Sequence, residues 1–150
     1  MVFVCKLFGK GEGYMIGVIL CSHASFAQGL YDAAEMITGE IENITVLPFV
    51  DGDNVDDLVE KMRTAAAGYR EKGLPYVYMV DLWGASPFNA SLKAEGDNGA
   101  DVVAGVNLPF FLEFLTSRDE FSGGPTAEFL DGIIEETGLV KRINLKELSG

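Results

Sequence analysis

The chain has 150 residues, of which 48% are hydrophobic, and a formal net charge of −12 at pH 7. This length and apolar content predict a single ordered domain with its own core. The acidic balance argues against nucleic-acid binding, which requires clustered Lys and Arg. No apolar run is long enough to span a membrane, so we expect no direct membrane insertion.

The first 14 residues differ from the rest of the chain. Glycines and lysines interrupt them, and they lack the apolar core and the small-residue cleavage site of a signal peptide. We therefore expect a cytoplasmic protein in which residues 1–14 are a non-native or dispensable extension and residues 15–150 form one domain. Cys5 and Cys21 do not suggest a disulfide framework, and with a single histidine a zinc site is not expected. We expect Cys21 to be buried as a small hydrophobe.

Strand-like and helix-like segments follow the extension. In chain order they are a strand at 15–21, a helix at 26–37, a strand at 44–50, a helix at 55–68, a strand at 76–80, a helix opening at 86, a strand at 101–105, and helices at 107–117 and 126–137. Turn residues mark the helix boundaries. We expect Gly39 to end the first helix, the turn at 51–54 to cap the second, and Ser86 to be the N-cap of the third with Pro87 as its first helical residue. Residues 118–125 are a predicted loop, and residues 139–145 are either a last strand or a tail.

The alternation of strands and helices predicts the fold class. It indicates a small doubly wound α/β fold with a mainly parallel sheet and helices on both faces. The strand order 2-1-3-4, as in flavodoxin-like folds, is the commonest for this size. In that order the first and third strands are neighbours, and ligands bind beyond their carboxyl ends.

Two titratable residues meet at this edge in the predicted fold. His23, the single histidine, follows the first strand, and Asp81 follows the third. A carboxylate that accepts from Nδ1–H fixes the histidine tautomer and leaves the lone pair of Nε2 free. The alternatives are a histidine that caps a helix or satisfies a carbonyl, and an aspartate that only forms a turn.

The segment after Asp81 has the properties of an anion site. Gly84 and Ala85 are small, so the backbone there could approach a ligand closely. The helix that opens at Ser86 would point free N–H groups and a partial positive charge toward the same crevice. A nucleophilic nitrogen beside an anion site is the arrangement needed to accept a phosphoryl group. Trp83 and Phe88 would form either a docking surface or half-buried packing.

Four segments resemble the enzyme IIA domains of the mannose/fructose/sorbose family of the bacterial sugar phosphotransferase system. They are SHASFAQGL at 22–30, EMITG at 35–39, VDLWGASPFNA at 80–90 and GVNLP at 105–109. The similarity extends from about Met15 to about Thr137. It implies that His23 is the phosphorylated residue, Asp81 its orienting acid and Ser86 a phosphate contact. Ala24 and Ala85 stand where glycines are common in the family, and Leu82 stands where a hydroxyl residue is frequent.

The resemblance also implies an activity and partners. Phosphorylated HPr would donate to His23, which would pass the group to a separate IIB protein during sugar uptake, without a metal or other cofactor. It implies a cytoplasmic homodimer with an exchanged antiparallel strand, drawn from 117–125 or 139–145. With no IIB-like region after the domain, we expect a lone IIA unit. The alternatives are the phosphotransferase subunit of dihydroxyacetone kinase, a regulatory domain that senses phosphorylation without a transport role, and a flavodoxin-like module that binds a small anion.

Overall fold

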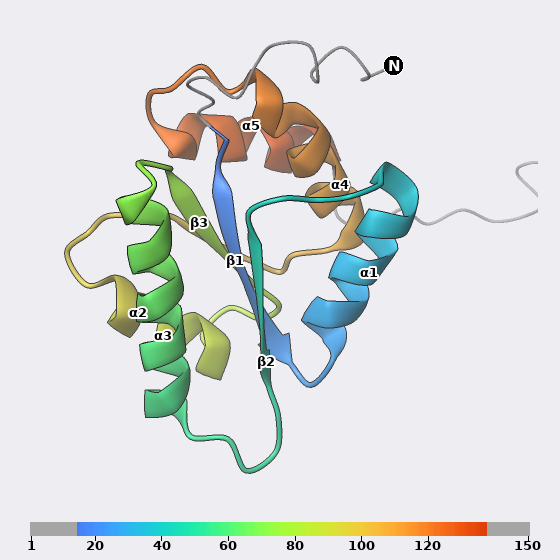
Figure 1. The fold of residues 1–150 in the computed structure, drawn as a ribbon. Coiled ribbons are helices and arrows are strands. Elements are labelled where there is room, and N and C mark those ends of the chain that lie inside the picture. Colours follow the sequence, from blue (N-terminus) through green and yellow to red (C-terminus); the bar gives the residue numbers. More distant parts are fainter. Residues whose placement is uncertain (1–14, 138–150) are drawn as a thin grey trace, which may run out of the picture.

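The computed structural model describes residues 15–137 of the chain. Strands and helices alternate through most of this range (Figure 1). In chain order the elements are β1 Gly17–His23, α1 Phe26–Thr38, β2 Ile44–Phe49, α2 Val55–Glu71, β3 Tyr76–Val80, α3 Ser86–Glu95, β4 Val102–Ala104, α4 Leu108–Ser117, the 3-10 helix η2 Arg118–Glu120 and α5 Thr126–Thr137.

The four strands form one parallel sheet in the order β2-β1-β3-β4. This confirms the predicted doubly wound, flavodoxin-like arrangement. β1 lies between β2 and β3, so the carboxyl ends of β1 and β3 are adjacent. The switch point of the sheet is therefore at the end of the strand that carries His23.

Helices cover the sheet on both faces (Figure 1). Val18 and Leu20 of β1 pack with α1, α4 and α5 in one hydrophobic cluster. Ile19 and Cys21 pack with α2 and α3 in the other. Successive side chains of a strand point to opposite faces, and residues 18–21 are therefore buried without a break. Cys21 is buried, as predicted.

Several predicted boundaries differ from the structure, and three of these differences have a clear physical reason. β1 continues through Ser22 to His23 because both residues extend the parallel ladder with β2, pairing with Pro48 and Phe49. α2 passes Gly68 and ends at Glu71, since the buried Tyr69 still packs in the core beyond the glycine.

The third error is at the start of α3. Ser86 is the first helical residue, and Ala85 occupies the N-cap position without a side-chain cap. Ala85 has extended dihedral angles, and its carbonyl accepts the N–H of Asn89, the first bond of the helix. The caps predicted elsewhere are confirmed, because Asn54 accepts from the N–H of Asp56 and the N–H of Gly39 bonds the Glu35 carbonyl.

The segment predicted as a loop at 118–125 begins with a helical turn. Arg118 in η2 is buried, and its guanidinium donates to the carbonyls of Ile16 and Glu42. These bonds fasten the segment to the region where β1 and β2 begin.

Some predictions lie outside the described residues. They concern residues 1–14, Cys5 and the strand or tail at 139–145. Within residues 15–137, no helix is long and apolar enough to cross a membrane.

Candidate functional site

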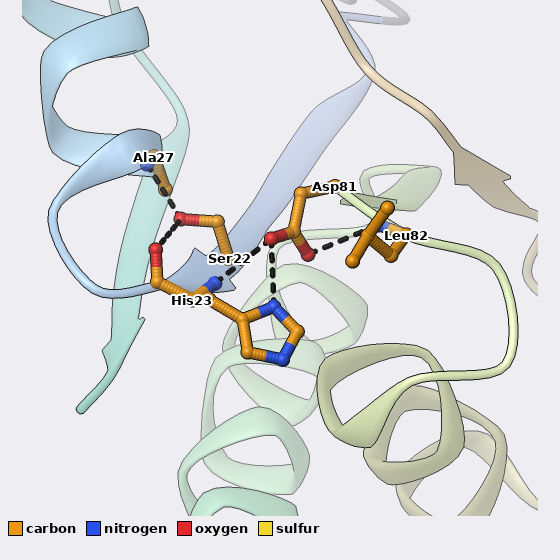
Figure 2. Close-up of polar contacts among 5 residues, drawn as sticks. All are labelled: Ser22, His23, Ala27, Asp81 and Leu82. Atoms are coloured by element: carbon orange, nitrogen blue, oxygen red, sulfur yellow. Dashed lines mark hydrogen bonds and ion pairs between the residues drawn. The ribbon is translucent and has the colours of Figure 1, made fainter. Parts of the chain in front are cut away.

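His23 and Asp81 are joined by two hydrogen bonds at the carboxyl edge of the sheet (Figure 2). The Oδ2 atom of Asp81 lies 2.8 Å from Nδ1 of His23 and accepts the main-chain N–H of His23 at 3.0 Å. The Oδ1 atom accepts the N–H of Leu82 at 3.0 Å. The carboxylate thus holds both the ring and the backbone of the histidine, and the predicted pairing is confirmed.

The electrostatics of this pair fix the histidine tautomer. Burial raises the pKa of Asp81, but the hydrogen bonds from the His23 ring and backbone outweigh it and bring the pKa below its ordinary value of 3.8. At neutral pH Asp81 is therefore an ionised group that only accepts hydrogen bonds. The neutral imidazole of His23 therefore carries its proton on Nδ1, and in this tautomer the lone pair is on Nε2.

Nε2 is on the side of the ring that faces away from Asp81 (Figure 2). The His23 side chain is 44% exposed, whereas that of Asp81 is 14% exposed. Among the hydrogen bonds of the described residues, none involves Nε2. A reacting group can therefore approach Nε2 from solvent while the opposite ring nitrogen stays bound.

The backbone around His23 makes a sharp turn into α1. Ala24 has a φ of 51°, a left-handed conformation that favours glycine. Its N–H bonds the carbonyl of Phe49 at 2.8 Å. Ser22 is buried beside it, and its hydroxyl accepts from Ala27 and donates to the His23 carbonyl. Hydrogen bonds to the Ala24 N–H and to the His23 carbonyl therefore fix this turn.

Gly84, Ala85 and Ser86 lie in the connection between β3 and the first turn of α3. Gly84 has a φ of 77°, and its carbonyl accepts a hydrogen bond from the side chain of Asn89 at 3.0 Å. Because Ser86 is not the N-cap, capping does not use its hydroxyl. The segment follows Asp81 directly, so it lies at the same edge of the sheet as His23.

Strand periodicity places His23 on the face of the sheet that α3 covers. Ile19 and Cys21 belong to the cluster on that face, and His23 is the next residue in the same alternation. Ser22 points the other way, toward α1, which explains its bond to Ala27.

Several large apolar side chains near the pair are exposed to solvent. They are Phe26, Leu82 and Trp83, and Trp83 is 78% exposed. The Trp83 ring packs against buried Phe88 with a centroid distance of 4.5 Å. The structure therefore assigns packing to Phe88 and an exposed position to Trp83.

Our interpretation of the sequence missed three contributors to this site. They are the Leu82 N–H, which bonds Asp81, the Ser22 hydroxyl, which bonds the His23 carbonyl, and the Phe49 ring. The Phe49 and His23 rings make a T-shaped contact with 6.2 Å between their centroids. The parallel pairing of the first two strands would have identified Phe49, because it is opposite His23 in the register. Within residues 15–137, no three His, Cys, Asp or Glu side chains come together in a way that could hold a metal ion.

Comparison with known proteins gives consistent matches. The model of the family described as "PTS system fructose IIA component" matches residues 17–130. The mannose-specific EIIAB component of Escherichia coli (strain K12) is 37% identical over 125 residues, which cover 82% of this chain and 37% of that protein. The chain thus spans little more than a third of that relative.

Two further relatives match over most of their own length. The fructose-specific EIIA component of Bacillus subtilis (strain 168) is 37% identical over 110 residues, covering 72% of this chain and 74% of that protein. The solved structure of the mannose/sorbose specific IIA subunit from Enterococcus faecalis superposes with a TM-score of 0.66 at 27% identity, covering 86% of this chain and 96% of that one. The family match, these relatives and the fold agree, and the chain belongs to the fructose IIA component family of the phosphotransferase system.

Proposed function

We propose that the protein is a phosphohistidine carrier of a sugar phosphotransferase system. His23 accepts a phosphoryl group from phosphorylated HPr on Nε2 and passes it to a IIB protein during sugar uptake. The observation that carries this proposal is the bond from Nδ1 of His23 to Asp81, which leaves a half-exposed Nε2 with a free lone pair. The relatives, whose names specify mannose, fructose and sorbose, support sugar uptake.

The transfer step uses the two ring nitrogens differently. The Nε2 lone pair attacks phosphorus and forms a new N–P bond, while the N–P bond of the donor breaks and its electron pair returns to the donor imidazole. The Nδ1 proton stays on His23 and remains hydrogen-bonded to Asp81. Because the phosphorylated ring gains positive charge, the carboxylate stabilises it as the bond forms.

The phosphoryl oxygens need donors of their own. We assign this role to the N–H groups at the start of α3, around Gly84, Ala85 and Ser86, and to the Ser86 hydroxyl. A helix start carries free N–H groups and a partial positive charge. Two observations support the assignment: His23 is on the face that α3 covers, and the Ser86 hydroxyl is not a helix cap.

The proposed partners are proteins. The exposed Leu82 and Trp83 follow Asp81 and give a donor or acceptor protein an apolar surface beside the histidine. We also propose that the protein acts in the cytoplasm as a homodimer, as the family resemblance implies.

The test is incubation of the protein with phosphorylated HPr, followed by mass spectrometry. One phosphoryl group should be added, should be labile in acid and stable in base as a phosphoramidate is, and should map to His23. His23→Ala should fold and take up none. Phosphate recovered on Ser86 or Asp81, or uptake by His23→Ala, would overturn the proposal.

The acceptor identifies the role of the carrier. Discharge of the phosphorylated protein by a IIB protein supports sugar uptake. Stable phosphorylation that no IIB protein discharges would instead favour a regulatory domain, and discharge only by the dihydroxyacetone kinase subunits would favour that enzyme.

A further inference from the structure

The hydroxyl of Ser22 joins the active-site strand to helix α1 (Figure 2). Ser22 is 0% exposed, and its Oγ donates to the His23 carbonyl at 3.1 Å while it accepts the N–H of Ala27 at 2.6 Å. A serine hydroxyl has one proton, so the first bond uses its donor capacity and the second uses acceptor capacity. If the hydroxyl were removed, the Ala27 N–H would lose this acceptor and the His23 carbonyl would lose this donor.

Helix α1 depends on this hydroxyl at its start. A serine normally caps a helix from the N-cap position itself. Ser25 holds that position here, yet its side chain makes no cap bond. The cap comes instead from Ser22 in β1, so the first turn of α1 is bonded directly to the strand that presents the histidine.

The peptide groups on either side of the His23 Cα are fixed by side chains. Its N–H donates to Asp81 and its carbonyl accepts from Ser22. The next residue, Ala24, has a φ of 51°, a conformation that an alanine adopts only when its surroundings impose it. The Ser22 bond is one of the contacts that impose this turn.

We propose that Ser22 is a positioning residue for phosphoryl transfer through His23. By holding the His23 carbonyl against the start of α1, it keeps the backbone in the conformation in which Nδ1 reaches Asp81 and Nε2 faces solvent. Without the hydroxyl, the turn at Ala24 relaxes, and the imidazole moves with its Cα. This inference rests on the proposed function, because it concerns the same histidine.

The test compares Ser22→Ala with a matched loss of a buried hydroxyl elsewhere. Ser91 is also 0% exposed, and its Oγ donates to the Phe88 carbonyl at 2.6 Å within α3. Ser91→Ala therefore controls for the loss of a buried hydrogen bond, and Ser22→Thr keeps the hydroxyl at the tested position. All are made in the full chain, and kcat and KM are measured for transfer from phosphorylated HPr.

Ser22→Ala should lower kcat by about threefold to tenfold, the equivalent of one hydrogen bond, with KM unchanged within about twofold. KM should hold because the exposed surface that meets the donor is unaltered. Ser22→Thr should restore most of kcat, and Ser91→Ala should transfer at the wild-type rate.

A second measurement does not depend on transfer. Because the chain has one histidine, the low-field NMR signal of the proton on Nδ1 is unambiguous. It should be sharp in the wild type and Ser91→Ala, and broadened or lost through exchange in Ser22→Ala. If the wild type accepted no phosphoryl group, the proposed function would fail while this signal still tested Ser22.

An unchanged kcat and an unchanged Nδ1 signal in Ser22→Ala would overturn the inference and leave Ser22 as a helix cap only. If Ser22→Ala does not fold, Ser22→Cys, which keeps a weaker donor of similar size, takes its place. A wild-type kcat and a wild-type Nδ1 signal in Ser22→Cys would overturn the inference in the same way.

Discussion

Ala24 and Ala85 are the two alanines at which the resemblance noted in the sequence would place glycine, yet their backbones differ. Ala24 has a φ of 51°, whereas Ala85 has a φ of −84° in extended backbone that any residue adopts. A left-handed alanine costs about 1–2 kcal/mol, and glycine loses about 0.5–1 kcal/mol more entropy on folding. Ala24→Gly should therefore stabilise the protein by about 0.5–1 kcal/mol, measured by urea unfolding.

Ala33→Gly, in the middle of α1, is the control, because it adds the entropy at a position with no strain to relieve. It should destabilise the protein by about 0.5–1 kcal/mol. Equal effects of the two substitutions would contradict the conformational argument.

In the proposed function, Asp81 orients the imidazole and stabilises its charge during transfer. Asp81→Asn keeps the shape but removes the charge that favours a proton on Nδ1. A hydrogen bond to a charged group contributes about 1.5–3 kcal/mol, so phosphorylation of His23 should slow by about tenfold to a hundredfold. Rapid-quench measurement with phosphorylated HPr tests this. A wild-type rate would mean that the contact seen at 2.8 Å has no part in transfer.

The lowered pKa of Asp81 also makes stability depend on pH. The hydrogen bonds from His23 outweigh the opposing effect of burial and hold this pKa below 3.8, so the unfolded chain binds more protons than the folded one as the pH falls toward 3.8. The contribution of the carboxylate is therefore complete above that value and is lost as pH falls through the folded pKa.

Urea unfolding from about pH 7 to about pH 2.5 measures this contribution. The stability gap between wild type and Asp81→Asn should be largest near neutral pH and should shrink at the acidic end. The exposed Asp97 provides a control, since Asp97→Asn should change stability by less than about 0.5 kcal/mol throughout. If the stability difference between wild type and Asp81→Asn did not vary with pH, the lowered pKa of Asp81 would be contradicted.

At the scale of elements, the sequence predicted which segments form neighbouring strands, but it did not predict where β1 ends or where α3 begins. The apolar runs of β1 and β3 identified two neighbouring strands, and this placed His23 and Asp81 together. Ser22 was missed because a serine after an apolar run resembles a turn residue, and only the register with β2 shows that it is still in the strand. The cap of α3 was wrong by one residue because serine is the commoner cap, whereas the bond from Asn89 to the Ala85 carbonyl sets the actual start.

The contact between β1 and α2 depends on a glycine. A Cβ atom on Gly17 would lie 2.6 Å from the ring of Tyr69. That ring has little freedom to move, because it stacks on Tyr76 and its hydroxyl donates to the Val18 carbonyl. Gly17→Ala should therefore destabilise the protein by about 1–3 kcal/mol in urea unfolding.

Gly68→Ala in α2 is the control that separates this clash from the general effect on stability of replacing a glycine by alanine. A Cβ atom there meets nothing within 4 Å, so the substitution should stabilise the helix by about 0.5–1 kcal/mol. If Gly17→Ala stabilised the protein to the same degree, the close approach of Tyr69 would be refuted.

For the whole molecule, the structure describes one of the two candidate segments for strand exchange, residues 117–125. Within residues 15–137, β4 pairs with β3 alone, so one edge of the sheet could take a further strand. The segment 117–125 is fastened to the rest of its own chain, because the buried Arg118 in it donates to the carbonyls of Ile16 and Glu42. To exchange this segment, both bonds of a buried cation would have to break, at about 1.5–3 kcal/mol each. This leaves 139–145 as the segment to test.

We therefore expect the full chain to be a dimer at micromolar concentration by light scattering, and a chain that ends at Gly138 to be a monomer. Circular dichroism should show that the shortened chain keeps its helices, because it retains every described residue of the two hydrophobic clusters. Arg118→Lys provides a second comparison. It keeps the charge but not the two-pronged donor geometry, so it should destabilise the fold without dissociating the dimer. A monomeric full chain would exclude exchange altogether, and a dimer that persisted after truncation at Gly138 would exclude 139–145 as its source.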